Sequence, residues 1–220
     1  MIERPYRIVA PCLEPVRTLY RDAHCWVVEK PSQLLSVPGR GPENHDSVTS
    51  RLQQQDAEVR VVHRLDLDTS GLMVFACTAA AQRRLNDAFA QRQVDKTYEA
   101  VVAGAVRLAE GEIDLPLRPD WLRRPRQKVC HRLGKPSLTR YKVLASEPDR
   151  TRLALYPITG RSHQLRLHLR AIGHPILGCD LYAPLSHLAA SPRLLLHATA
   201  LGFAHPDDGR WMTFESPAPF

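Results

Sequence analysis

The pattern of apolar and polar positions along the chain predicts many strands and few helices. Runs of β-branched and aromatic residues bounded by proline, glycine and aspartate are typical of strands, and they fall at 26–28, 59–62, 72–75, 97–102, 111–115, 137–145, 152–158, 194–203 and 211–214. Apolar positions four apart predict helices over 47–55, 78–92 and 162–172. Asp46 and Thr78 are the expected caps of the first two helices, and Gly173 is expected to end the third. Strands without regular βαβ alternation predict an α+β fold with a mixed, mainly antiparallel sheet flanked by helices.

Size and composition place the chain among globular proteins. Its 220 residues are 44% apolar, enough for one large domain or two small ones. Residues 1–15 contain three prolines and are predicted to form an irregular arm. The sequence has no run near the roughly 18–20 apolar residues of a membrane span, and no signal-type apolar core at its start. Five scattered cysteines fit reduced thiols, so we expect a cytoplasmic protein.

Positive charge is concentrated in one stretch of the chain. The net charge is +7 and the isoelectric point about 9.4, which favours a polyanionic partner over an acidic one. Seven cations lie in a proline-broken, loop-like stretch: Arg118, Arg123, Arg124, Arg126, Lys128, Arg132 and Lys135. Asp120 is the acid among them, and Trp121 offers a ring for base stacking. The stretch is typical of a surface that follows a phosphate backbone, although a basic solvated face is the plainer alternative.

The segment His63–Gly71 holds the most informative acids. Asp66 follows a basic pair within an apolar run, and Asp68 begins a polar turn. Carboxylates are seldom buried unless they are paired, so both need a reason to be there. For Asp68 the turn itself is sufficient reason, because its side chain can accept hydrogen bonds from nearby backbone N–H groups. Spacing alone leaves Asp66 open between a structural acid and a catalytic one.

Four motifs resemble those of the RluA-type pseudouridine synthases. His63–Gly71 matches H-R-L-D-x-x-T-S-G at every fixed position, and Gly160–His168 matches G-R-x-H-Q-x-R-x-H. Lys96–Tyr98 matches K-x-Y, and 194–198 matches the late L-H-A block. The motifs occur in the family's order, and the likeness extends from about residue 16 to the last residue. Within the family, the likeness is greatest to members that modify both ribosomal RNA and tRNA. This narrower resemblance rests on Ser36–Arg40, Arg124–Cys130 and the shortness of the chain.

The resemblance implies a fold and a domain plan. It implies that 16–220 form the pseudouridine synthase catalytic domain, with a bent sheet and an active site in a central cleft. Other members carry an extra N-terminal (S4-like) RNA-binding module. Only 62 residues precede His63, and they match the catalytic domain's own opening, so we expect that module to be absent. The implied partners are stem-loops of ribosomal RNA and tRNA, bound by a monomer without a protein partner.

The resemblance also assigns roles at the site. It implies Asp66 as the catalytic nucleophile or base, Arg161 as its cationic partner and Tyr98 as the active-site tyrosine. It further implies that Arg64 enters the RNA where the target base has left, and that Leu196 forms an apolar wall for uracil. The plainer alternatives are a surface arginine for Arg161, a strand aromatic for Tyr98, a phosphate contact for Arg64 and a core leucine for Leu196. The RNA contacts expected outside the motifs are Trp121, Arg123, Arg124, Arg126 and Lys128.

The histidines and glutamine of the motifs are expected to be structural. The proposed chemistry has no evident need of imidazole, so His63, Gln164, His168 and His197 are predicted to make structural hydrogen bonds. The chain departs from the family's N-K-P-x-G block, where Gln33 stands in place of glycine, and we expect this to affect the turn.

Two other functions fit parts of the sequence. A non-catalytic RNA-binding protein would need the positive charge but not Asp66, Arg161 and Tyr98 together. A glycosidase could use Asp66 and Asp68 as its carboxylate pair, because such enzymes separate them by roughly 5–9 Å. Isomerisation of uridine involves no redox change, so no cofactor is expected. The spacing of the ten histidines favours no metal site, and the phosphate-binding glycine motifs are missing from the sequence.

Overall fold

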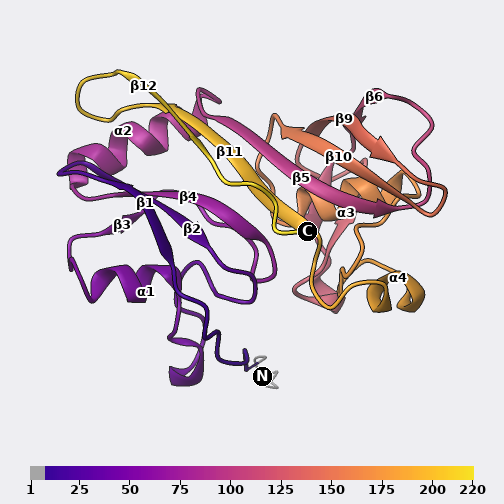
Figure 1. Ribbon diagram of the computed structural model, residues 1–220, viewed down its shortest axis with the longest axis horizontal. Helices are drawn as coiled ribbons and strands as arrows, with labels where there is room; N and C mark the ends of the chain where they lie inside the picture. The colour runs from indigo at the N-terminus through magenta and orange to yellow at the C-terminus, as the bar shows by residue number, and fades with distance from the viewer. Residues whose placement is uncertain (1–7) are drawn as a thin grey trace. The chain divides into compact units, whose positions relative to one another are not determined.

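Two compact units make up the chain in a computed structural model that describes residues 8–220 (Figure 1). Unit 1 comprises the chain through Asp95 together with Leu201–Ser216, and unit 2 comprises Lys96–Ala200 with Pro217–Phe220. Residues 8–16 contain no helix or strand, and residues 1–7 of the predicted arm lie outside the described part. No helix within residues 8–220 has the length and apolarity to cross a bilayer.

Unit 1 is built on antiparallel strands. Its elements are β1 (Arg17–Arg21), β2 (Cys25–Lys30), η1 (Pro42–Asn44), α1 (Val48–Gln53), β3 (Arg60–Val61), β4 (Ser70–Ala76), α2 (Ala79–Ala90), β12 (Trp211–Glu215) and the end of β11 (Leu196–Ala204). The strand order is β1-β2-β4-β11, with β3 paired to β4 and β12 to β11. β2 pairs with β4 from Cys25↔Ala76 to Lys30↔Gly71. This register brings the end of β2 beside the start of β4, where the His63–Gly71 segment ends.

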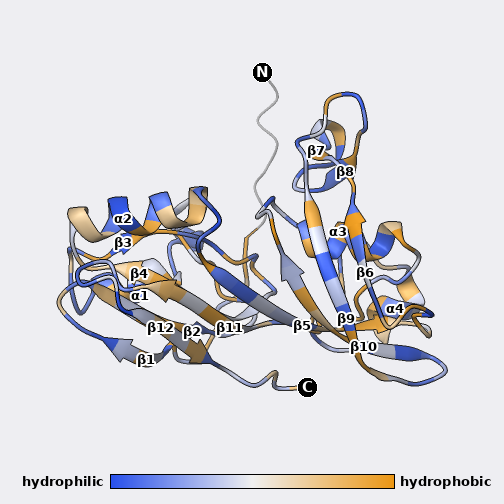
Figure 2. Ribbon diagram, turned by 90° about the horizontal axis from the view of Figure 1, so that it is seen from above, coloured by the Kyte–Doolittle hydropathy of each residue, from blue (hydrophilic) through white to orange (hydrophobic). Residues whose placement is uncertain are grey.

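Both faces of the central strands in unit 1 are buried. Cys25 and Val27 of β2 lie in one apolar cluster with Leu72 and Val74 of β4, and Leu85 of α2 packs into it. The alternate residues point to the other face because side chains alternate along a strand. In Figure 1 the strands β2 and β4 run between α1 and α2. Figure 2 shows hydrophobic and hydrophilic residues alternating along α2, as expected for a helix with one buried face.

The caps of the two helices differ in how well the sequence predicted them. Thr78 caps α2 as expected, and its hydroxyl accepts a hydrogen bond from the Ala81 N–H at 3.1 Å. The cap predicted for α1 was wrong, because Ser47 and not Asp46 precedes its first turn. Ser47 Oγ accepts from the Ser50 N–H at 3.1 Å, and Ser50 Oγ accepts from the Ser47 N–H at 2.9 Å, which forms a reciprocal capping box.

The Asp46 carboxylate has another use. It accepts two hydrogen bonds from Arg51, from Nε and Nη2, both at 2.7 Å. A guanidinium held by both oxygens of a carboxylate is a stronger arrangement than a single bond to a backbone N–H. Asp46 therefore joins the exposed side of α1 to its preceding loop.

Unit 2 contains the second set of strands and two helices. Its elements are β5 (Asp95–Ala103), β6 (Glu110–Asp114), β7 (Leu117–Pro119), η2 (Trp121–Arg123), β8 (Gln127–Val129), β9 (Leu138–Ser146), β10 (Arg150–Pro157), α3 (Gln164–Ala171), α4 (Leu185–Ala189) and the start of β11. The strand order is β11-β5-β10-β9-β6, and β7 and β8 form a separate two-stranded sheet. β5, β10, β9 and β6 pair in an antiparallel manner.

The core of unit 2 lies between this sheet and α3. Leu165 and Leu169 of α3 pack in one buried cluster with Leu153 and Leu155 of β10. Gly173 follows the helix with φ +90°, the left-handed conformation that glycine adopts at no steric cost, so it ends α3 as predicted. The α+β fold with mainly antiparallel pairing is confirmed, and the central cleft and the 16–220 domain assignment stay predictions.

Candidate active site

Asp66 lies in an extended segment between β3 and β4, immediately before a tight turn. The side chains alternate along this segment: Arg64 is exposed, Leu65 is buried and Asp66 is half-buried. The Asp66 carbonyl accepts a hydrogen bond from the Thr69 N–H at 3.2 Å, which closes the turn over Leu67 and Asp68. The carboxyl group is thus carried by a short loop, and the position of that loop depends on what holds its backbone.

The fully buried ammonium group of Lys30 binds the backbone of the Asp66 loop. Its side chain is 0% exposed, and Nζ donates hydrogen bonds to the carbonyls of Pro31 at 2.8 Å, Leu34 at 2.7 Å and Leu67 at 2.9 Å. A lysine ammonium has three N–H donors, so it can bond all three carbonyls at once. The bond to Leu67 joins the end of β2 to the residue directly after Asp66.

Two serines from the same segment hold the residues on either side of Asp66. Ser36 Oγ donates to the Leu65 carbonyl at 2.7 Å and accepts from the Leu65 N–H at 3.1 Å. Ser32 Oγ donates to the Asp68 carbonyl at 2.8 Å. Lys30, Ser32 and Ser36 therefore fix the backbone on both sides of the carboxylate. We call this set the loop scaffold.

Gln33, which replaces the family's glycine, lies within the segment that carries the loop scaffold. Its φ is +62°, the left-handed region that glycine adopts freely and a side chain disfavours. The turn therefore has the conformation that a glycine would favour, with a glutamine in it. The lysine and serines on either side keep their bonds to the Asp66 loop.

His63 has the structural role predicted for it. Its Nε2 accepts a hydrogen bond from the Val74 N–H at 3.0 Å, and its ring stacks on Phe89 of α2 with centroids 4.7 Å apart. His168 is likewise buried, with Nδ1 3.0 Å from Thr139 Oγ1 and Nε2 3.0 Å from the Leu115 carbonyl. Burial lowers the pKa of His168, which favours a neutral ring. His197 is also fully buried.

Arg161 lies in unit 2, in the turn between β10 and α3. Its side chain is exposed, and Nε donates to the Pro136 carbonyl at 3.3 Å. Its backbone N–H donates to Gln164 Oε1 at 3.0 Å, and the same oxygen accepts from the Thr159 hydroxyl at 2.7 Å. The Gln164 amide nitrogen donates to Thr139 Oγ1 at 2.9 Å. Gln164 thus holds the turn in the structural role predicted for it.

Tyr98 and Leu196 also belong to unit 2. Tyr98 is half-buried on β5, opposite Leu155 of β10, and packs against the core cluster that includes Leu196. Leu196 is 2% exposed, which fits the alternative of a core leucine. Asp66 belongs to unit 1 and Tyr98 and Arg161 to unit 2, so the joint action of the three at one uridine stays a prediction.

The stretch expected to be a basic loop forms a hairpin, so its description as loop-like was wrong. β7 and β8 pair from Leu117↔Val129 to Pro119↔Gln127, and η2 lies at the tip. We call Leu117–Val129 the basic hairpin. The stretch was predicted to be loop-like because it contains prolines at 119 and 125. Proline is nevertheless tolerated in short strands at a sheet edge.

The tip of the basic hairpin presents an aromatic ring and a guanidinium together. Trp121 is 58% exposed, and the Arg124 Cζ lies 3.9 Å from the centre of its ring. Asp120 is buried at the base of the tip and pairs with Arg123 at 3.1 Å and Lys128 at 3.5 Å. The acid therefore orients two of the cations, and Arg124 rests on the tryptophan.

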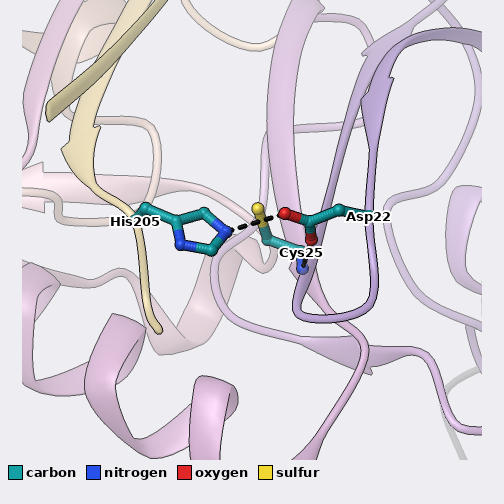
Figure 3. A group of neighbouring side chains, drawn as sticks. All are labelled: Asp22, Cys25 and His205. Atoms are coloured by element: carbon teal, nitrogen blue, oxygen red, sulfur yellow. Dashed lines mark hydrogen bonds and ion pairs between the residues drawn. The ribbon is translucent and has the colours of Figure 1, made fainter. Parts of the chain in front are cut away.

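Asp22, Cys25 and His205 form a separate cluster in unit 1 (Figure 3). Among the described residues, one group of three potential metal ligands lies within 4.8 Å, and it is this one. Figure 3 shows the His205 ring directed at the Asp22 carboxylate beside the Cys25 side chain, and His205 Nε2 is 2.8 Å from Asp22 Oδ2. Burial raises the pKa of the Cys25 thiol to about 12, so a metal ion would have to displace a firmly held proton.

The Asp22 carboxylate is fully used as a hydrogen-bond acceptor in this cluster. Oδ1 accepts from the backbone N–H groups of His24 and Cys25, both at 2.8 Å. Oδ2 accepts from the Tyr20 hydroxyl at 2.8 Å, in addition to His205. The cluster therefore ties the β1–β2 turn to the residue after β11, and its chemistry is that of a structural hydrogen-bond network.

The stability that Asp22 provides is expected to depend on pH. Burial raises the pKa of its carboxyl, but the four hydrogen bonds outweigh burial and hold the pKa well below its usual range. A carboxyl with a depressed folded-state pKa stabilises the protein above the unfolded-state pKa of about 4, and this stabilisation is lost as the pH falls toward the folded-state pKa. We expect the difference in unfolding free energy between wild type and Asp22→Asn to be largest near pH 7 and to shrink below about pH 4.

Urea unfolding from pH 7 to pH 3 measures this difference. Asp87→Asn is the matched control, because Asp87 is exposed on α2 and its side chain has no ion pair or hydrogen bond within the described residues. A difference for Asp22→Asn that stays constant across this range would contradict the role given to its carboxylate.

Comparison with known proteins identifies the family. Residues 24–171 match the family of RNA pseudouridylate synthases. The dual-specificity RNA pseudouridine synthases RluA of Escherichia coli (strain K12) and Pasteurella multocida (strain Pm70) are 53% and 50% identical over 203 residues, covering 92% of this chain and 93% of each relative. The solved structure of human RNA Pseudouridylate Synthase Domain Containing 1 has a TM-score of 0.78 at 28% identity, covering 99% of this chain and 87% of that chain. The chain therefore belongs to the RNA pseudouridylate synthase family, whose members are RNA-modifying isomerases.

Proposed function

We propose that this protein converts uridine to pseudouridine in RNA hairpin loops, with the Asp66 carboxylate as nucleophile or base. The observation that carries the proposal is the loop scaffold. A buried lysine and two serines fix the backbone of the residues on both sides of Asp66. The Asp66 side chain itself is half-buried, so it is partly accessible to solvent. A reacting group must be held in one geometry to gain from proximity, and this arrangement supplies that rigidity.

The chemistry requires one carboxylate and no cofactor. The N-glycosidic bond between the sugar and N1 breaks, the uracil turns, and a carbon–carbon bond forms between the sugar and carbon five of the base. Carbon five loses a proton in this step and N1 gains one, so the reaction is an isomerisation. The carboxylate either adds to the sugar or removes a sugar proton, and both roles need the ionised form. Arg161 supplies the positive charge that favours that form, and Tyr98 stacks on the base.

The target base must leave its stack to reach a carboxylate. Flipping costs a few kcal/mol of lost stacking, and an arginine plane that takes the vacated place recovers part of it. Arg64 is exposed two residues before Asp66, on the same short segment, which suits it to that role.

The proposed substrates extend the resemblance to the dual-specificity enzymes. The RluA relatives are described as dual-specificity RNA pseudouridine synthases. By resemblance to that group we propose uridine 746 of 23S ribosomal RNA and uridine 32 of tRNA as the targets. The alternative is a pseudouridine synthase of this family acting on another ribosomal or tRNA site. Splayed single-stranded loops are the form in which RNA bases are read by stacking and shape, which both alternatives require. The protein is proposed to act as a cytoplasmic monomer.

Synthetic stem-loops of the two proposed targets test the function. After incubation, the RNA is digested to nucleosides and measured for pseudouridine and for free uracil. An isomerase produces the first and a glycosidase the second, while a non-catalytic RNA-binding protein produces neither. Stem-loops with the target uridine moved by one position separate the two alternatives for the substrate, and failure of every loop to yield pseudouridine would overturn the proposal.

The basic hairpin is proposed to bind the phosphate backbone of the RNA near the RNA hairpin loop that carries the target uridine. Its exposed Trp121 offers a ring face for an unpaired base, and the hairpin also carries the cations Arg123, Arg126 and Lys128. Stacking of one base on an aromatic side chain contributes about 1–3 kcal/mol, and phosphate contacts add a salt-dependent part.

Charge reversal in the hairpin is expected to weaken binding far more than chemistry. Arg124→Glu with Arg126→Glu removes the guanidinium stacked on Trp121 and a neighbouring cation. Each lost phosphate contact should flatten the slope of log affinity against log salt by roughly 0.7–0.9. Binding titrations at several salt concentrations and single-turnover rates at saturating RNA measure the two effects separately.

The chain offers a control with the same change in charge. Arg107→Glu with Arg150→Glu alters two exposed arginines of unit 2, and Arg150 begins β10 at the opposite end from the Arg161 turn. This variant should keep its salt slope. Equal losses in both double variants would show that overall charge, and not the hairpin, determines RNA binding.

A further inference from the structure

The turn that carries Arg161 contains a strained residue. His163 has φ +55° and ψ +19°, the left-handed region that a non-glycine residue adopts at a cost of roughly 1–3 kcal/mol. Such a conformation persists only where the surroundings impose it. The side chain makes no cap bond to α3, and its ring nitrogen Nδ1 instead contacts a residue elsewhere in unit 2.

Tyr182 supplies such a contact. Its hydroxyl lies 2.7 Å from His163 Nδ1, and the two rings meet edge to face with centroids 5.7 Å apart. The same hydroxyl accepts a hydrogen bond from the Gln127 N–H of β8 at 2.8 Å. Since a phenol has one proton and accepts at its oxygen, the arrangement suits an O–H that donates to His163 and accepts from the hairpin. One buried phenol thus joins the basic hairpin to the turn of Arg161.

Tyr182 is itself held in place. It is 5% exposed, and the Arg166 guanidinium lies 5.5 Å from the centre of its ring. Arg166 is buried, with Nη2 2.6 Å from Asp180 Oδ1 and Nε 3.3 Å from Cys179 Sγ. A buried, paired cation packed against the ring restricts the motion of the phenol. The Tyr182 hydroxyl is therefore held in place between the Arg161 turn and the basic hairpin.

We propose that Tyr182 is a positioning residue. Its hydroxyl fixes the conformation of the Arg161 turn through His163, and it connects that turn to the basic hairpin through the backbone N–H of Gln127. This inference rests on the proposed function, because it assigns Tyr182 to the reaction through Arg161. Misplacement of a reacting group by about 1 Å can cost 10²-fold in rate, so the loss of one such bond is enough to be measured.

Tyr182→Phe removes the hydroxyl and keeps the ring. We expect the single-turnover rate at saturating stem-loop RNA to fall about tenfold, with RNA affinity within about threefold of wild type. If Tyr182 acts through Arg161, the same substitution in an Arg161→Lys background should cost less than about twofold. His163→Gly, which adopts the left-handed conformation freely and has no side chain to bond the phenol, should reproduce the loss.

Tyr141→Phe is the matched control. Tyr141 is also buried in unit 2, but its hydroxyl makes no hydrogen bond within the described residues, so its loss should leave the rate unchanged. Equal rate losses from Tyr182→Phe in the wild-type protein and in the Arg161→Lys variant would show a general structural role and overturn the inference. So would an unchanged rate in Tyr182→Phe.

Amide hydrogen exchange on the free protein gives an answer that does not depend on activity. Tyr182→Phe should speed exchange at Gln127 and across 161–167, while Tyr141→Phe should not. Unchanged exchange in both segments would overturn the inference. A wild-type protein that forms no pseudouridine contradicts the proposed function, whereas an active wild type unaffected by Tyr182→Phe contradicts this inference alone.

Discussion

Asp66→Asn is expected to abolish pseudouridine formation while RNA affinity stays within about threefold of wild type. The amide has the shape of the carboxylate and fits the same half-buried position. It can neither add to the sugar nor remove a proton, so the chemical step loses its reacting group. A catalytic loss of at least about 10³-fold corresponds to roughly 4 kcal/mol of transition-state stabilisation. Single-turnover assays with saturating enzyme measure the rate, and filter binding measures the affinity.

Asp68→Asn is the control for this experiment. Asp68 is a half-buried carboxyl in the same loop, two residues further on, and its backbone carbonyl is held by Ser32. The turn tolerates asparagine at such a position as well as aspartate, so activity should be largely retained. Retention of more than a tenth of the wild-type rate by Asp66→Asn would refute its assignment, and equal loss in both variants would show that the intact turn, and not the Asp66 carboxylate in particular, is required.

Much of the fold could be predicted because its main signals are local. β4 is a continuous apolar run, and Thr78 precedes an amphipathic helix, so both elements were found from neighbouring residues alone. β1 was missed because two of its five residues are arginines and much of it is exposed, as at the edge of a sheet. An edge strand has one unpaired side facing solvent and needs no apolar alternation.

The site could be predicted in part for a related reason. The reacting residue Asp66 lies within one contiguous motif, but the scaffold that holds its loop comes from a distant segment. Lys30 and Leu67 are 37 residues apart, and Ser36 and Leu65 are 29 apart. Side-chain bonds to backbone carbonyls leave no periodic pattern in a sequence, so these roles were missed. A lysine at the end of a strand of buried residues was the one available signal, because a charge in such a place needs partners.

Lys30→Met tests the loop scaffold and is expected to destabilise the protein strongly. Methionine fills much of the space of the lysine stem but donates no hydrogen bond, so the carbonyls of Pro31, Leu34 and Leu67 each lose a donor in a buried site. One buried unsatisfied group costs about 1–3 kcal/mol, so we expect a loss of about 3 kcal/mol or more in unfolding free energy. Urea unfolding at pH 7 measures this loss.

The same substitution distinguishes two roles for Lys30: positioning of the Asp66 loop for catalysis, and stabilisation of unit 1 alone. At a temperature where circular dichroism shows Lys30→Met to be folded, the single-turnover rate should still be at least about tenfold below wild type, because the segment on either side of Asp66 is no longer fixed. Lys142→Met makes the same chemical change at an exposed position on β9 and should alter stability by less than about 0.5 kcal/mol and the rate not at all. A folded Lys30→Met protein with a wild-type rate would mean that the buried ammonium stabilises unit 1 without positioning Asp66. The carboxylate geometry would then have to depend on the Ser36 hydroxyl and the Thr69 turn alone.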